Sequence, residues 1–238
     1  MSANADRVSV DRGRVFGQHE EGVYERIAPE YFPDSIVREH EARYRWAARY
    51  VAGKSVLDVG CGTGYGCSLL SHCGAKRVIG VDISFPALEY AKRCQIQGLV
   101  GANVIRLPFG SSTFDVVTCF EVIEHIADQS ELLEEMKRVL RTGGVVVLST
   151  PNRNRTSGNN PYHVKELLLS ELLALTRKHG LRCIERSGQH WELRPKLLKW
   201  VYGIRRAIYG IENTARVFRA PEIIAEPSVF LVAARKEQ

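Results

Sequence analysis

The sequence predicts an α/β protein built on a doubly wound, mostly parallel sheet. Two observations indicate this class: short apolar runs alternate with helical patterns, and a glycine-rich turn directly follows the first run. Apolar runs of this kind suit strands that are covered by helices on both faces of a sheet. Seven strands are expected, at 55–59, 78–82, 98–105, 114–119, 145–150, 181–186 and 228–235.

The first two well-marked helices are predicted from helical spacing and from residues that start or stop helices. One covers 34–51, where an apolar stripe at three- and four-residue steps precedes Gly53. The other begins after Ser84, which is expected to cap it, has Pro86 early in the helix, and runs to about Cys94. The stripe of the first helix consists of Ile36, His40, Tyr44, Ala47 and Val51.

Two later helices are predicted at 130–141 and 170–179, the second stopped by Gly180. The segment 191–227, between the last two strands, is far longer than a hairpin turn. Its apolar residues are interleaved with Lys and Arg, which predicts a helical lid insertion over the active site. The buried face of the helix at 130–141 is expected to consist of Leu132, Leu133, Met136, Val139 and Leu140.

Three glycines at alternate positions, Gly60, Gly62 and Gly64, join the first strand to the next helix. Glycines there let the backbone approach a ligand closely, and the helix N-terminus attracts a negative group. A dinucleotide fingerprint needs a glycine at its sixth position, where this chain has Tyr65 or Cys67, depending on the starting glycine. The spacing therefore argues against a dinucleotide and favours another nucleotide-type ligand.

Asp82 ends the second strand, about 18 residues beyond Gly64. A carboxylate at about this separation is expected to bind both hydroxyls of a ribose. The alternative is that Asp82 caps the following helix.

With Asp58 two residues ahead of Gly60, this stretch resembles motif I of the class I S-adenosylmethionine-dependent methyltransferases. The resemblance implies a Rossmann-like seven-stranded sheet with an antiparallel last strand. It also implies that Asp58 helps to anchor the methionine amino group, directly or through water, and that Ile83 packs on the adenine. The expected cofactor-binding residues are Asp58, Gly60, Cys61, Gly62, Gly64, Asp82, Ile83, Asn103, Val104 and Phe120.

Asn103 occupies the position, four residues before Leu107, where the family usually has an acid that binds the adenine. The amide oxygen of asparagine can still accept a hydrogen bond from the adenine amino group. This departure from the family pattern leaves the register of the adenine site open.

Methyl transfer from a sulfonium is an in-line displacement, which needs a positioned nucleophile and a route for one proton. Glu121, Glu124 and His125 follow the strand at 114–119, and His163 lies beyond the strand at 145–150. We expect Glu121, His125 and His163 to act on the acceptor. A histidine here could serve as general base, as substrate-positioning group or as a structural residue.

The order Glu-x-x-Glu-His followed by a downstream His-x-x-Glu is similar to the small-RNA 3′-terminal 2′-O-methyltransferases, and ubiquinone-biosynthesis O-methyltransferases share much of it. The first resemblance implies that Glu121, Glu124, His125 and His163 hold a divalent metal, and this donor set suits Mg²⁺, Mn²⁺ or Fe²⁺. A bound metal would lower the pKa of an acceptor hydroxyl and orient it.

A broader resemblance covers roughly residues 22–190 and includes Glu39-His40, Arg43-Tyr44 and the segment 160–167. It points to a bacterial family associated with glycan and natural-product biosynthesis. We therefore expect transfer of a methyl group from S-adenosylmethionine to a hydroxyl of a small-molecule, sugar or glycan acceptor. The alternatives are an N-methyltransferase on an amino sugar, an RNA 2′-O-methyltransferase, and a quinone or lipid-linked O-methyltransferase at a membrane surface.

Composition bounds these expectations. The chain has 238 residues and 45% hydrophobic content, enough for one domain, expected at 34–238, preceded by a leader or lid at 1–33. No apolar run approaches the ~18 residues of a membrane span, and 1–18 lacks a hydrophobic signal region, so a cytoplasmic protein is expected. The six cysteines form no Cys-x-x-Cys pair, which argues against zinc.

The formal net charge of +6 is concentrated at 186–219, a segment that contains eight Lys and Arg residues and only two Glu residues. Such a segment suggests an anionic partner or a membrane surface. The alternative is that it forms a helical face that is only exposed to solvent and binds nothing. The chain shows no recognisable RNA-binding domain, which weighs against nucleic acid without excluding it.

Overall fold

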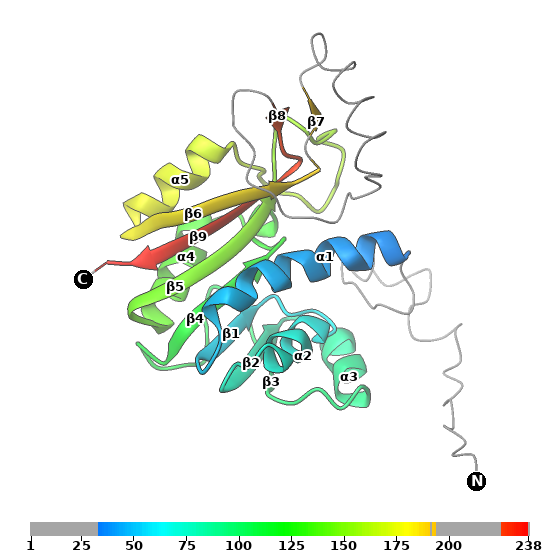
Figure 1. Cartoon of the computed structure of the whole chain (residues 1–238), viewed down its shortest axis with the longest axis vertical. Helices are drawn as coiled ribbons and strands as arrows, with labels where there is room; N and C mark the ends of the chain where they lie inside the picture. The colour runs from blue at the N-terminus through cyan, green and yellow to red at the C-terminus, as the bar shows by residue number, and fades with distance from the viewer. Residues whose placement is uncertain (1–32, 191, 194–224, 238) are drawn as a thin grey trace, which may run out of the picture.

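A computed structural model describes residues 33–190, 192–193 and 225–237 of the chain. Its main feature is a seven-stranded sheet in the order β3-β2-β1-β4-β5-β9-β6, with helices on both faces (Figure 1). The helices are α1 (Asp34–Ala47), η1 (Ala48–Tyr50), α2 (Tyr65–His72), α3 (Phe85–Arg93), η2 (Ile123–His125), α4 (Gln129–Val139) and α5 (Leu169–Lys178). The strands are β1 (Ser55–Val59), β2 (Arg77–Asp82), β3 (Leu99–Gly101), β4 (Phe114–Phe120), β5 (Leu140–Pro151), β6 (Leu181–Gln189), β7 (Glu192–Leu193), β8 (Ala225–Glu226) and β9 (Val229–Lys236).

The sheet is parallel from β3 to β5 and becomes antiparallel at β9. β9 is inserted between β5 and β6, pairing Ala233 with Val147 on one side and Leu231 with Ser187 on the other. The predicted doubly wound sheet with an antiparallel last strand is therefore confirmed. In such a sheet the carboxyl ends of β1, β2, β4 and β5 meet at one edge, where ligands bind.

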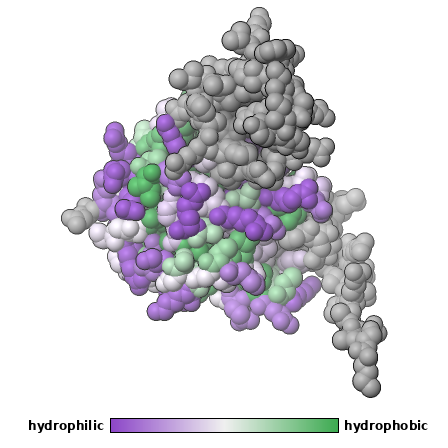
Figure 2. Space-filling view, in the orientation of Figure 1, coloured by the Kyte–Doolittle hydropathy of each residue, from purple (hydrophilic) through white to green (hydrophobic). Residues whose placement is uncertain are grey.

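Neighbouring residues of the central strands face opposite sides of the sheet, as the pleat requires. Val56 of β1 packs in one core cluster with Tyr44 of α1, whereas Leu57 packs in the other with Met136 of α4. Figure 1 shows α1 in front of the strands and α4 behind them. On the face in Figure 2, hydrophilic residues surround smaller apolar patches, as expected when most apolar residues are buried in the core.

Three boundaries differ from the predicted ones. The helix predicted to end at Arg141 ends at Val139, because Leu140 is extended and pairs with Phe114 at the start of β5. The first helix stops at Ala47 and continues as the short 3-10 turn η1. The strand predicted at 98–105 is confined to Leu99–Gly101, after which the chain forms a turn in which the amide of Arg106 donates to the carbonyl of Asn103.

Two predicted features lie largely outside the described residues: the leader at 1–33 and the helical insertion at 191–227. The same holds for most of the basic segment at 186–219. The ends of the insertion are described, and there β7 pairs with β8 through Glu192 with Glu226 and Leu193 with Ala225. Among the described residues, no helix is long and apolar enough to cross a membrane.

Candidate active site

The glycine loop between β1 and α2 has a backbone that only glycine adopts readily. Gly60, Gly62 and Gly64 all have positive φ angles, of 72°, 54° and 74°. A Cβ at Gly60 would lie 2.3 Å from Cγ2 of Val122, which follows β4. The glycines therefore allow both the turn and the close approach of the loop to the end of β4.

Asp82, at the carboxyl end of β2, is hydrogen-bonded to this loop. Its Oδ2 accepts from the amide of Gly62 at 2.8 Å, and its Oδ1 accepts from the amide of Ser84 at 2.8 Å. Ser84 in turn caps α3 by accepting from the amide of Ala87, as predicted. The next residue, Ile83, is 62% exposed and lines the cavity described below, so its aliphatic side chain is accessible to a ligand.

Asp58 lies beneath the loop and is 1% exposed. Its Oδ1 accepts from Oγ1 of Thr118 at 2.6 Å, and its Oδ2 accepts from the phenol of Tyr44 at 3.0 Å and from Sγ of Cys67 at 3.5 Å. Burial raises the pKa of Asp58 to about 6, although these hydrogen bonds oppose the shift. The carboxylate thus ties the end of β1 to α1, α2 and β4.

A cavity of about 350 Å³ opens at this edge of the sheet. Seven of the predicted cofactor-binding residues line it, whereas Asp58, Gly64 and Asn103 are outside its lining. The amide oxygen of Asn103 accepts from the backbone of Ile105, so it is already engaged within its own turn. The seven lining residues are Gly60, Cys61, Gly62, Asp82, Ile83, Val104 and Phe120.

The cavity wall also contains residues that the sequence analysis did not assign to the site. His40 and Tyr44 of α1 line it, although both were predicted on a buried stripe. Burial, with a contribution from the neighbouring Arg43, lowers the pKa of His40 to about 2, so its imidazole is neutral. In the sequence, the only sign of this role was that His40 and Tyr44 carry polar groups one turn apart on an otherwise apolar stripe. The remaining unassigned lining residues are Thr63, Tyr65, Val122, Ile126 and Tyr162.

Glu121 directly follows β4 and lines the cavity. Its φ angle is +52°, a conformation that non-glycine residues rarely adopt and that often marks functional positions. Its Oε1 accepts from Oγ of Ser149 at 2.6 Å and lies 3.7 Å from Nη1 of Arg43, which is itself buried. These contacts turn the carboxylate toward α1 and β5.

Glu124 is completely buried in η2. Its Oε2 accepts from Oγ1 of Thr150 at 3.0 Å, whereas its Oε1 has no hydrogen-bond partner among the described residues. Burial, together with the charge of Glu121, raises the pKa of Glu124 well above its ordinary value. A buried carboxylate oxygen without a partner is costly and calls for a functional explanation.

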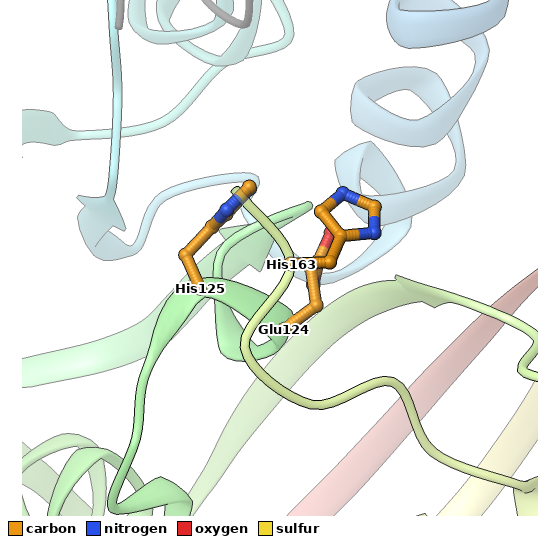
Figure 3. Close-up of side chains that lie close together, drawn as sticks. All are labelled: Glu124, His125 and His163. Atoms are coloured by element: carbon orange, nitrogen blue, oxygen red, sulfur yellow. The ribbon is translucent and has the colours of Figure 1, made fainter. Parts of the chain in front are cut away.

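His125 and His163 lie beside Glu124 (Figure 3). One ligand-type atom from each of the three residues lies within 4.8 Å of the others, and the two rings meet edge to face with centroids 5.0 Å apart. Nδ1 of His125 lies 2.9 Å from the carbonyl oxygen of Tyr162. The structure thus brings together three of the four predicted metal ligands. Glu121 does not join this cluster, because its carboxylate contacts Ser149 and Arg43 instead.

These three side chains could hold a divalent cation. Two imidazoles and one carboxylate suit Mn²⁺ or Fe²⁺. Oε1 of Glu124 would be a ligand of such a cation, which would supply the partner that this oxygen lacks among the described residues. Metal ligands bonded at about 2.1 Å lie at most about 4.2 Å apart, and the three atoms, all within 4.8 Å of one another, are close to this spacing. His125 also lines the cavity, which joins this cluster to the predicted cofactor site.

The fold and the site together define the class of protein. The seven-stranded sheet, the glycine loop and the acid at the end of β2 have the arrangement of class I S-adenosylmethionine-dependent methyltransferases, as the resemblance in the sequence predicted. Residues 57–148 match the family model described as a methyltransferase domain. The matched range runs from β1 to β5 and includes the loop, Asp82 and Glu121.

Curated relatives support the same class. The chain is 38% identical over 157 residues to a "probable S-adenosylmethionine-dependent methyltransferase" of Mycolicibacterium smegmatis, over 63% of this chain and 61% of that protein. It is 29% identical over 158 residues to a ubiquinone biosynthesis O-methyltransferase of Colwellia psychrerythraea, over 57% of this chain and 64% of that protein. These matches span about three fifths of the length of both relatives.

Solved structures share the fold. A SAM-dependent methyltransferase from Archaeoglobus fulgidus superposes with a TM-score of 0.62 at 21% identity, covering 86% of this chain and 95% of that chain. At this identity the likeness concerns the fold alone.

Proposed function

We propose that this protein transfers the methyl group of S-adenosylmethionine to a hydroxyl of a small-molecule, sugar or glycan acceptor. The observation that carries the proposal is the placement of Glu124, His125 and His163 beside the cavity lined by the glycine loop and Asp82. A cofactor in that cavity, with its ribose at Asp82, would lie within the same pocket as Glu121 and His125. The side chains that could hold and deprotonate an acceptor therefore lie next to the glycine loop and Asp82, which are expected to bind the methyl donor.

In the proposed reaction, the acceptor oxygen attacks the methyl carbon as the bond from that carbon to the sulfonium sulfur breaks. The products are the methyl ether and S-adenosylhomocysteine, and the hydroxyl proton must leave. When no metal is bound, His125 is the titratable group best placed to receive this proton, because it lines the cavity while its Nδ1 is held by the carbonyl of Tyr162. Glu121, which also lines the cavity, would orient the acceptor.

The finer part of the proposal is metal assistance. Glu124, His125 and His163 would hold a divalent cation, which when bound would lower the pKa of the acceptor hydroxyl and orient it. Without a metal, His125 or His163 would act as base or positioning group. The unpartnered, fully buried oxygen of Glu124 favours the metal.

A phenolic acceptor is a second candidate, because the chain is similar to proteins named ubiquinone biosynthesis O-methyltransferases. It involves the same reaction on a ring hydroxyl. A cytoplasmic enzyme, alone or associated with a membrane through 186–219, is consistent with either acceptor.

The test is transfer of isotopically labelled methyl from S-adenosylmethionine to a panel of catechols, sugar diols, amino sugars and RNA 3′ ends. Label on hydroxyl oxygen, reduced at least tenfold in His125→Ala, would support the proposal. His72→Ala is the matched control, since His72 is an exposed histidine at the end of α2, outside the lining of the predicted cofactor cavity. Label confined to amines would establish an N-methyltransferase, and label confined to RNA would establish the nucleic-acid alternative.

A further inference from the structure

Glu166 forms a close pair with His163 in the loop between β5 and α5. Oε1 of Glu166 lies 2.6 Å from Nδ1 of His163, and the Glu166 side chain is only 8% exposed. Its other carboxylate oxygen accepts from the hydroxyl of Thr156. Both oxygens are thus engaged, and the carboxylate is fixed in one orientation relative to the imidazole.

The backbone around this pair is fixed to η2. The carbonyl of Glu124 accepts from the amides of Val164 at 2.8 Å and Lys165 at 3.1 Å. Nε2 of the buried Gln129 donates to the carbonyl of Lys165 at 2.8 Å. The loop that carries His163 and Glu166 is therefore bonded directly to the residue whose side chain completes the three-residue cluster.

We propose that Glu166 is a positioning residue that holds the proton of His163 on Nδ1 and fixes the plane of its ring. A neutral imidazole protonated on Nδ1 carries its lone pair on Nε2, the form in which it can bind a metal or receive a proton. This inference rests on the proposed function of the site. It adds a residue that acts through His163 and does not itself touch the acceptor.

The arrangement of His125 supports this role. Its Nδ1 is also held by an acceptor of the same loop, the carbonyl of Tyr162. Both imidazoles of the cluster therefore have Nδ1 against an oxygen acceptor, the pattern by which proteins orient metal-binding histidines. By contrast, a histidine outside the site whose Nδ1 also approaches a glutamate, His179 with Glu134, is 3.6 Å from it, and that carboxylate is 69% exposed.

The test compares Glu166→Ala and Glu166→Gln with Glu134→Ala as the matched control. The ring ¹⁵N signals of His163 at pH 8 report which nitrogen carries the proton, and they do so in the full chain without any added ligand. Glu166→Ala should lose the Nδ1-protonated form, whereas Glu166→Gln should retain it, because an amide oxygen can still accept from Nδ1. Glu134→Ala should leave His163 unchanged.

The second readout is Mn²⁺ affinity. Removing a carboxylate that orients a ligand typically weakens metal binding by about 10–100-fold, and we expect a loss in this range for Glu166→Ala with unchanged affinity for S-adenosylhomocysteine. If Glu166→Ala fails to fold, Thr156→Val supplies the ¹⁵N and Mn²⁺ measurements, because it removes the hydroxyl that fixes the other oxygen of Glu166. Unchanged His163 signals in Glu166→Ala, or in Thr156→Val where Glu166→Ala does not fold, would overturn the inference. If the wild-type chain binds no Mn²⁺, metal assistance fails, and the ¹⁵N signals alone decide the role of Glu166.

Discussion

The phenol of Tyr44 donates a 3.0 Å hydrogen bond to the carboxylate of Asp58, joining α1 to the end of β1 directly beneath the glycine loop. Tyr44 also lines the predicted cofactor cavity, so the same residue borders the ligand site and contacts the buried acid. A change in the charge of Asp58 should therefore alter both the stability of the fold and the affinity for the cofactor.

Asp58→Asn should alter the pH dependence of stability. Because burial raises the pKa of Asp58 from 3.8 to about 6, the folded state binds more protons between these values, and stability falls as the pH rises through them. The contribution corresponds to roughly 3 kcal/mol between about pH 4 and 6. The free energy of unfolding of the variant, relative to wild type, should rise over this range in urea titrations. A pH-independent difference between the two proteins would contradict the assignment.

The same carboxylate tests the predicted anchoring of the methionine amino group. A cationic ligand group near Asp58 would favour its charged form, so S-adenosylmethionine should bind more tightly as the pH rises through about 6. Calorimetry from pH 5 to 7.5 should show this gain in wild type and not in Asp58→Asn. Equal pH profiles would mean that Asp58 acts only on the fold.

Gly60→Ala should impair cofactor binding through both the backbone angle and the collision with Val122. We expect a loss of about 2–3 kcal/mol in stability and at least tenfold in affinity for S-adenosylhomocysteine. Gly53→Ala is the matched control, because Gly53 has a φ of 69° but a Cβ added there would meet no atom within 4 Å. It should cost only about 1–2 kcal/mol and leave affinity unchanged. Similar affinity losses in both variants would show that the contact with Val122 is unimportant.

Asp82→Asn should weaken cofactor binding through the ribose. The carboxylate already accepts from Gly62 and Ser84, and asparagine has a single acceptor oxygen, so the variant also loosens the loop. Hydrogen bonds to a charged group contribute about 1.5–3 kcal/mol, which corresponds to roughly 10–100-fold in affinity. Wild type should prefer adenosine to 2′,3′-dideoxyadenosine, and the variant should lose that preference. A retained preference would assign the ribose to another residue.

The sequence was sufficient to predict the fold and to single out residues that meet at one cavity, because both depend on local patterns. Strand periodicity, the positive-φ glycines and the spacing to Asp82 are encoded within short stretches, and the structure brings Gly60, Gly62 and Asp82 to one cavity. The extension of β5 back to Leu140 was not predictable, because it depends on pairing with Phe114 across the sheet.

Contacts between distant segments explain the other differences. His40 enters the cavity wall because α1 lies over the carboxyl edge of the sheet, which no local pattern specifies. Glu121 is oriented by its contacts with Ser149 and Arg43, whereas Asn103 is engaged locally by the amide of Ile105. Such competition for a side chain is visible only once the chain is folded.

Binding of Mn²⁺ in the presence of S-adenosylhomocysteine, followed by electron paramagnetic resonance, tests the central claim most directly. The three-residue cluster predicts one specific site in wild type that is lost in His163→Ala and retained in His72→Ala. Since burial raises the pKa of Glu124, its proton must leave for metal to bind, and affinity should fall as the pH is lowered. Absence of a specific site in wild type, or its persistence in His163→Ala, would contradict metal-assisted transfer by this cluster.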